Sequence, residues 1–199
     1  MRKICISITL VLTIGLCACK NNTLVEEQNE QQEVVYNDKI QDTFFGVSFG
    51  ASKEEVITAF AYHNFYPGYF DTDSRLSFEK KIGYETGQRF SFGDMTWEML
   101  DVYLSNNRFN EIQFMNAHNT RESALNDFNY ILSKVSAKYH LQESSHNDTT
   151  IYKKYIGKTR NGQWISILCF SYESVYEKHL IGTRLAYGNN QFKYISDEL

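Results

Sequence analysis

This chain has very little proline, and few of its cysteines could pair in a disulfide. Proline occurs once, at Pro67, among 199 residues, and cysteine occurs four times. Cys5, Cys17 and Cys19 fall in the first nineteen positions, which leaves Cys169 alone in the remainder. An internal disulfide is therefore excluded there, even in an oxidising compartment. The folded core must be stabilised by the burial of apolar side chains, without disulfides. The 14 Phe, 14 Tyr and 2 Trp residues supply side chains for it.

Clustered positive charge is also missing. The net charge is −4 at pH 7, and loss of Arg2 and Lys3 with a cleaved leader would make it −6. Nucleic-acid binding needs a clustered basic face, so we expect no nucleic-acid partner. No polybasic patch for anionic lipid is present either. No segment after position 18 is long and apolar enough to span a bilayer.

Recognisable catalytic, cofactor and metal motifs are lacking as well. The five histidines (His63, His118, His140, His146 and His179) include no pair at zinc-hydrolase spacing, and isolated surface or helix-end histidines are the favoured interpretation. His140 and His146 flank a polar loop and are the one pair that could share a metal. Asp71 and Asp73 open a calcium-loop pattern that lacks its glycine. Cys169 lies in an apolar strand and is interpreted as a small buried hydrophobe. We therefore assign no catalytic, cofactor or metal residue.

The N-terminus carries an export signal. Arg2 and Lys3 form a short positive start, and positions 4–16 then run mostly apolar. This is the pattern of a signal peptide, and the apolar run is too short for a membrane helix. Positions 1–18 are therefore interpreted as a cleaved leader.

The residues at the cleavage point, Leu16-Cys17-Ala18-Cys19, resemble the lipobox of bacterial lipoproteins. In that family the cysteine receives a diacylglycerol, and cleavage occurs in front of it. The resemblance assigns lipid attachment to Cys19, and two or three acyl chains would hold the protein stably at a membrane. Lys20 follows where Asp can retain family members at the inner membrane, so an outer-membrane address in the cell envelope is favoured. Ordinary signal-peptidase cleavage after Ala18 is the alternative.

Positions 19–42 are predicted to be a disordered polar tether, because the Gln- and Glu-rich stretch 28–33 lacks apolar periodicity. A single domain is predicted over 43–199. Its first helix, at 52–63, begins with the capping-box spacing of Ser52 and Glu55. A second helix, at 121–140, begins at Thr120. Alternation predicts strands at 75–81, 89–104 (with a bend near Gly93-Asp94), 109–115, 150–157, 163–172 and 180–187. Asn106-Asn107 suits a hairpin turn between the second and third of these strands, because Asn tolerates positive φ.

The two halves of this domain share a pattern. Each contains one helix and then three strands, and Trp97 and Trp164 occupy matching positions in the middle strand. The pattern predicts an internal duplication with pseudo-repeats at about 44–117 and 118–199. The predicted fold class is therefore α+β, with two tandem αβββ halves forming an antiparallel sheet and the helices packed on one face.

The stretch 49–56 (FGASKEEV) resembles a helix start common in small lipoproteins of Bacteroides-type bacteria. The tandem helix-plus-meander layout is similar to that of β-lactamase-inhibitor proteins and, more loosely, to BamE-type lipoprotein domains. These resemblances imply a binding scaffold. The function expected is a non-enzymatic binding or assembly module for a protein or glycan partner in the envelope. An envelope hydrolase with an unrecognised site, or a purely structural envelope lipoprotein, remains the alternative.

Overall fold

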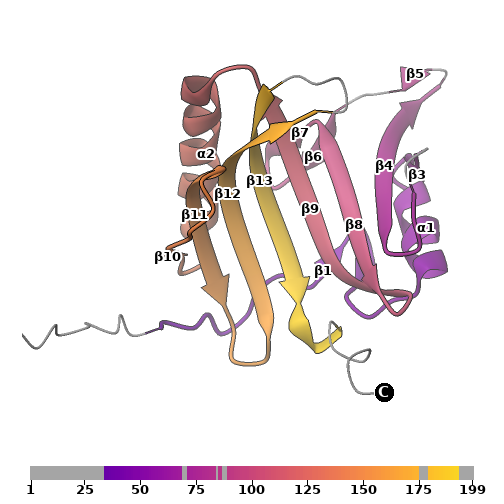
Figure 1. The fold of residues 1–199 in the computed structure, drawn as a ribbon. Coiled ribbons are helices and arrows are strands. Elements are labelled where there is room, and N and C mark those ends of the chain that lie inside the picture. The colour runs from indigo at the N-terminus through magenta and orange to yellow at the C-terminus, as the bar shows by residue number, and fades with distance from the viewer. Residues whose placement is uncertain (1–33, 69–70, 84, 87–88, 175–178, 193–199) are drawn as a thin grey trace, which may run out of the picture. The chain divides into compact units, whose positions relative to one another are not determined.

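The computed structural model describes residues 34–68, 71–83, 85–86, 89–174 and 179–192 (Figure 1). The strands are β1 (Thr43–Phe44), β2 (Val47–Ser48), β3 (Phe65–Pro67), β4 (Arg75–Ile82), β5 (Glu85–Thr86), β6 (Phe90–Phe92), β7 (Met95–Trp97), β8 (Met99–Ser105), β9 (Arg108–His118), β10 (Gln142–Glu143), β11 (Ile151–Lys158), β12 (Gln163–Glu173) and β13 (His179–Asn189). The helices are α1 (Lys53–Ala61), α2 (Arg121–Ser136) and the 3-10 helix η1 (Asn190–Phe192). The predicted leader and Cys19 lie outside the described residues.

One antiparallel sheet dominates the structure. Its strand order is β10-β11-β12-β13-β9-β8-β4-β3, with β5 pairing alongside the end of β4. The centre of the sheet is the pairing of β13 with β9, which runs from Gly188 opposite Glu111 to Ile181 opposite His118. Because β9 and β13 are far apart in sequence, this pairing joins the two parts of the chain into a single sheet.

The prediction of two helix-plus-three-strand halves is wrong. Strand makes up 49% of the structure and helix 18%, so the protein is mostly β. The predicted strand 89–104 is three strands, because Gly93 and Asp94 have φ values of 62° and 60° and form a hairpin turn. The hairpin pairs β6 with β7 as a separate two-stranded sheet. The matched tryptophans also differ, since Trp97 is fully buried in β7 whereas Trp164 is partly exposed on β12.

Local signals for helix starts and turns are confirmed, whereas both helices end earlier than predicted, α1 at Ala61 and α2 at Ser136. Ser52 caps α1 with both hydrogen bonds of the capping box, and Thr120 caps α2 by accepting from the Ser123 amide. Both residues of the Asn106-Asn107 turn have positive φ, at 50° and 60°, as the β8–β9 hairpin requires. In the described residues, no helix is long and apolar enough to cross a membrane.

The core lies on one side of the main sheet. Both helices and the β1–β2 and β6–β7 hairpins cover this side (Figure 1). Phe92 of β6 stacks on Phe114 of β9 with ring centroids 4.3 Å apart, and Phe60 of α1 packs 4.6 Å from Phe78 of β4. Burial of these rings against the sheet supplies the stabilisation that disulfides do not.

The compact unit begins at Val34, before the predicted domain start at position 43. Ile40 is fully buried, and the Asn37 side chain exchanges hydrogen bonds with the backbone of His140 at 2.7 and 2.9 Å. The last part of the predicted tether is therefore packed on the domain.

Candidate functional site

No hydrogen bond, ion pair or ring contact joins Cys169 and the histidines to one another in the described residues. Cys169 of β12 is fully buried, and burial raises the pKa of its thiol, as expected for a small core hydrophobe. The His63 ring packs against Phe45 at 5.3 Å, and His146 Nδ1 lies 3.1 Å from the Asp148 carbonyl. No group of three or more metal-ligating side chains occurs in the described part of the chain.

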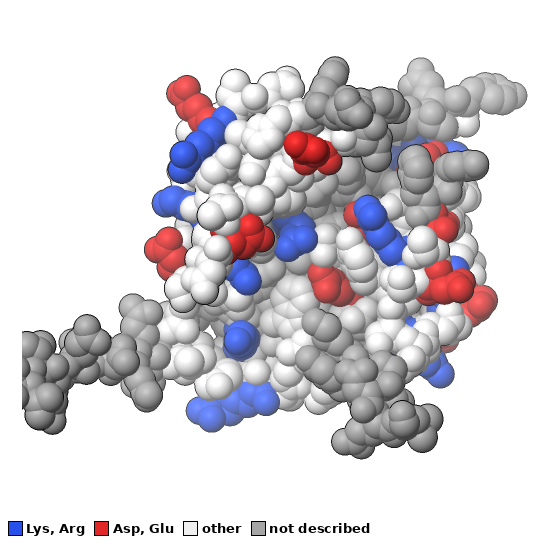
Figure 2. All heavy atoms as spheres, viewed as in Figure 1, with Lys and Arg blue, Asp and Glu red and all other residues white. Residues whose placement is uncertain are grey.

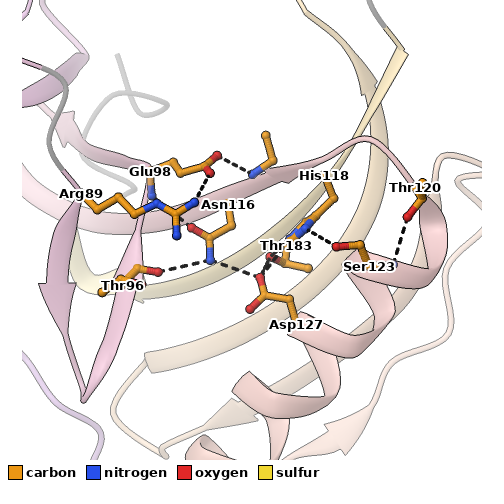
Figure 3. Close-up of polar contacts among 10 residues, drawn as sticks. Arg89, Thr96, Glu98, Asn116, His118, Thr120, Ser123, Asp127 and Thr183 are labelled. Carbon is orange, nitrogen blue, oxygen red and sulfur yellow. Dashed lines mark hydrogen bonds and ion pairs between the residues drawn. The ribbon is translucent and has the colours of Figure 1, made fainter.

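His118, interpreted from the sequence as an isolated histidine, is instead the centre of a polar cluster (Figure 3). It ends β9, and its ring points toward the first two turns of α2. His118 Nδ1 lies 3.1 Å from Ser123 Oγ, and Nε2 lies 3.0 Å from Asp127 Oδ2. The side chains of His118 and Asp127 are 14% and 22% exposed, so the pair is largely shielded from water. We call His118, Asn116, Ser123, Asp127 and Thr183 the His118 cluster.

Asp127 is the acceptor that joins three elements. Its Oδ2 accepts from Asn116 Nδ2 of β9 at 3.1 Å, and it also accepts from the hydroxyl of the fully buried Thr183 of β13. His118 contributes a third contact to the same oxygen. A carboxylate with several donors is a strong acceptor, so these bonds fix α2 against β9 and β13.

A second set of hydrogen bonds connects the His118 cluster to Glu98, the residue that follows β7, and through it to Arg89. Glu98 pairs with Arg89 at 2.7 Å and accepts from the Ala117 amide at 3.0 Å. Asn116 closes the connection, because its Oδ1 accepts from the Glu98 amide at 3.0 Å. A cavity of about 300 Å³ lies beside these residues and is lined in part by Trp97, Glu98, Asn116, His118 and Asp127.

The order Ser123–His118–Asp127 is that of a serine hydrolase, but the two ring nitrogens are exchanged, since the serine contacts Nδ1 and the aspartate contacts Nε2. With the proton on Nε2 facing Asp127, Nδ1 is free to accept from the Ser123 hydroxyl, an assignment made from the network. Ser123, however, does not line the cavity. A molecule held in the cavity would contact His118 and Asp127, and it would not contact the Ser123 hydroxyl. The His118 cluster is therefore best described as a set of hydrogen bonds that holds α2 against the sheet, and we call this connection the brace.

A larger, shallow groove of about 930 Å³ lies between the β1–β2 hairpin and α1. Two of its polar side chains are bonded within the protein, since Arg108 donates to the Gly50 carbonyl at 3.2 Å and Glu55 accepts from Ser52. Phe45 forms part of its wall at a φ of 51°, which is rare for a bulky residue. The Phe45 ring packs edge-on against Phe60 and Phe65, so core packing accounts for this conformation.

The second candidate site is the face of the main sheet opposite the helices, which we call the open face. Two half-buried rings of β12 lie over glycines of β13. A Cβ at Gly188 would come within 2.3 Å of the Trp164 ring, and one at Gly182 within 2.9 Å of the Phe170 ring. The missing side chains therefore let both rings lie flat on the sheet. Trp164 Nε1 donates to Asn190 Oδ1 at 3.1 Å, which fixes its ring.

Charged side chains of both signs lie on this side of the molecule (Figure 2). On β8, Asp101 is 9% exposed and accepts from Arg75 at 2.7 Å and from Ser77 at 2.6 Å. Arg184 of β13 lies over the Phe170 ring at 5.5 Å, and its Nε is buried without a hydrogen-bond partner. Burial lowers the pKa of Arg184, although nearby Glu111 opposes the shift.

No protein family, curated protein or solved structure was found to match this chain.

Proposed function

We propose that this chain is a lipid-anchored cell-envelope protein that binds a glycan or protein partner through the open face of its sheet. The leader, the lipobox-like sequence and Cys19 support the anchor, and Lys20 favours the outer membrane. The observation that carries the binding role is the pair of rings, Trp164 and Phe170, held flat over glycines. Rigid aromatic faces lose little entropy on binding, and aromatic residues are enriched at recognition surfaces.

The anchor is tested by replacing the modified cysteine. Cells expressing the wild type or Cys19→Ser are labelled with a radioactive fatty acid and fractionated. We expect the wild type to incorporate label and to sediment with membranes, whereas the variant loses the label. A variant that is processed normally and stays bound to membranes would contradict the proposal.

The binding role is tested by crosslinking in cells, followed by recovery of the full-length protein. Wild type and Trp164→Ala are compared, and Tyr130→Ala is the control because Tyr130 is an exposed aromatic residue of α2. We expect a reproducible partner that is lost in Trp164→Ala and kept in the control. Recovery of the same partner from all three would remove the open face from the proposal.

Hydrolysis is a second candidate function, and the order Ser123–His118–Asp127 is the observation that favours it. A fluorophosphonate probe reports a serine activated by a histidine. Labelling of the wild type that disappears in Ser123→Ala would support this function, and equal labelling of the two proteins would exclude it. A purely structural envelope role is the remaining alternative, and it predicts high copy number and envelope leakage on deletion.

A further inference from the structure

The charges and rings of the open face form ordered rows across β11, β12 and β13. The register places Lys154, Leu168 and Arg184 opposite one another in one row. A second row contains Lys158, Trp164 and Gly188. Because side chains alternate between the faces of a strand, all of these positions share the face that carries Trp164. Figure 2 shows Lys and Arg side chains on this side of the molecule.

We call Lys154, Lys158 and Arg184 the basic strip. None of the three forms an ion pair with another described residue. Arg184 donates to Gln113 Oε1 at 3.4 Å, and its buried Nε has no acceptor. The Arg184 side chain is half-buried and has no carboxylate within ion-pair distance in the described residues, and its exposed part could pair with a planar anion.

Two carboxylates of this face lie near the strip. Asp101 is paired with Arg75, whereas Glu111, opposite Gly188, accepts from the neutral amide of Gln113 and keeps its negative charge. The three cations of the strip outnumber this carboxylate, in a protein whose net charge is −4. The charge complement of the strip is an anionic ligand.

The distance between the two rings determines the shape of the ligand. Trp164 and Phe170 are six positions apart on β12, a separation of roughly 20 Å at the rise of a strand. Arg184 lies over the Phe170 ring, and Lys158 is paired with Trp164 across the strands. A ligand that reaches both rings must be elongated, with flat apolar faces and with anionic groups between and beside them.

An acidic polysaccharide has these properties, because pyranose rings present flat C–H faces and uronic acids carry a carboxylate on each ring. An extended acidic peptide would bind a sheet most readily by adding a strand at an edge. The edge strands here offer little for that, since β3 has three residues including Pro67 and β10 has two.

We propose that the open face binds a linear, carboxylated polysaccharide, with sugar rings on Trp164 and Phe170 and carboxylates on Arg184, Lys154 and Lys158. The inference rests on the proposed binding function and names its ligand class.

The test measures binding of the detergent-solubilised, full-length mature protein to polygalacturonate by calorimetry. Neutral dextran and polyglutamate are the comparison ligands. We expect binding to polygalacturonate that weakens as salt is raised, and little binding to the other two. Arg184→Gln and Trp164→Ala should each weaken it about tenfold or more. Lys134→Gln on α2 is the matched charge control and should bind like the wild type.

Circular dichroism and thermal unfolding confirm that each variant is folded, and Lys154→Gln provides a milder substitution if Arg184→Gln does not fold. Equal binding to dextran, or stronger binding to polyglutamate, would overturn the acidic polysaccharide while leaving a binding module in place. Failure to bind polygalacturonate also overturns this inference. If the cellular partner is in addition unaffected by Trp164→Ala, the proposed use of the open face fails as well.

Discussion

Trp164 of β12 lies directly across from Gly188 of β13, and a methyl group at position 188 would come within 2.3 Å of the Trp164 ring. The two residues therefore act as a unit, in which the absent side chain makes space for the ring. The first prediction follows from this contact.

Gly188→Ala should push the Trp164 ring off the sheet. We expect a loss of about 1–3 kcal/mol in the free energy of unfolding, measured in urea, because overpacking strains the structure. Tryptophan emission should shift to the red as the ring becomes more exposed. Gly83→Ala is the control, since Gly83 has a φ of 63° and no neighbour within 4 Å. It should lower stability by about 1 kcal/mol through backbone strain alone, without changing the emission. Unchanged emission in Gly188→Ala would contradict the prediction.

Asp127→Ala should weaken the brace between α2 and the sheet. The substitution removes the carboxylate acceptor of the buried Thr183 hydroxyl, and it removes one of the two acceptors of the Asn116 amide, which keeps the Thr96 carbonyl. Unsatisfied buried donors cost about 1–3 kcal/mol each, so we expect the urea midpoint to fall clearly. Asn126→Ala, at an exposed position of the same helix, should change stability by about 0.5 kcal/mol or less. A similar effect of both substitutions would argue against the brace.

The ionisation of Glu55 should make the stability of the protein depend on pH in acidic solution. The backbone and side chain of Ser52 donate to its carboxylate at 2.7 and 2.9 Å, and these bonds lower its pKa from the ordinary value of 4.5. A lowered pKa in the folded state means that the contribution is present above pH 4.5 and is lost as pH falls through the folded-state value. Thermal unfolding of wild type and Glu55→Gln should therefore converge as pH falls from 6 to 3. Glu54→Gln is the control, and a constant gap between wild type and Glu55→Gln would disprove the assignment.

Cys169 should react with thiol reagents only when the protein unfolds. Its side chain is fully buried, and burial raises the pKa of the thiol, so little reactive thiolate is accessible. In the mature protein we expect labelling by an aromatic disulfide reagent to follow the urea unfolding curve. Cys169→Ser identifies any signal from another source. Rapid labelling of the native protein would show instead that the thiol is accessible.

Signals confined to neighbouring residues could be predicted from the sequence. The Ser52–Glu55 capping box, the Thr120 cap and the Asn106-Asn107 turn all depend on chemistry within four positions, and the structure contains each of them. The interpretation of Cys169 as a buried residue followed in the same way from the apolar strand around it.

Long-range arrangement could not be predicted. The β13–β9 pairing and the bond between Asp127 and Thr183 join parts of the chain that no local pattern connects; the latter pair is 56 positions apart. The β1–β2 turn was also missed, because Phe45 occupies a positive-φ position where Asn or Gly would have been the usual signal. The position of the rings on the open face could not be predicted either, since the pairing of rings with glycines depends on strand register.

The short edge strands have a consequence for how copies of this protein coexist. An exposed strand edge is a template for pairing with another chain, and such pairing leads to aggregation. Here β3 includes Pro67, which has no amide proton to donate, and β10 offers two residues. If lipid anchors concentrate many copies in one membrane leaflet, these short edge strands would prevent the sheets of neighbouring copies from pairing. Each open face would then stay free for its ligand.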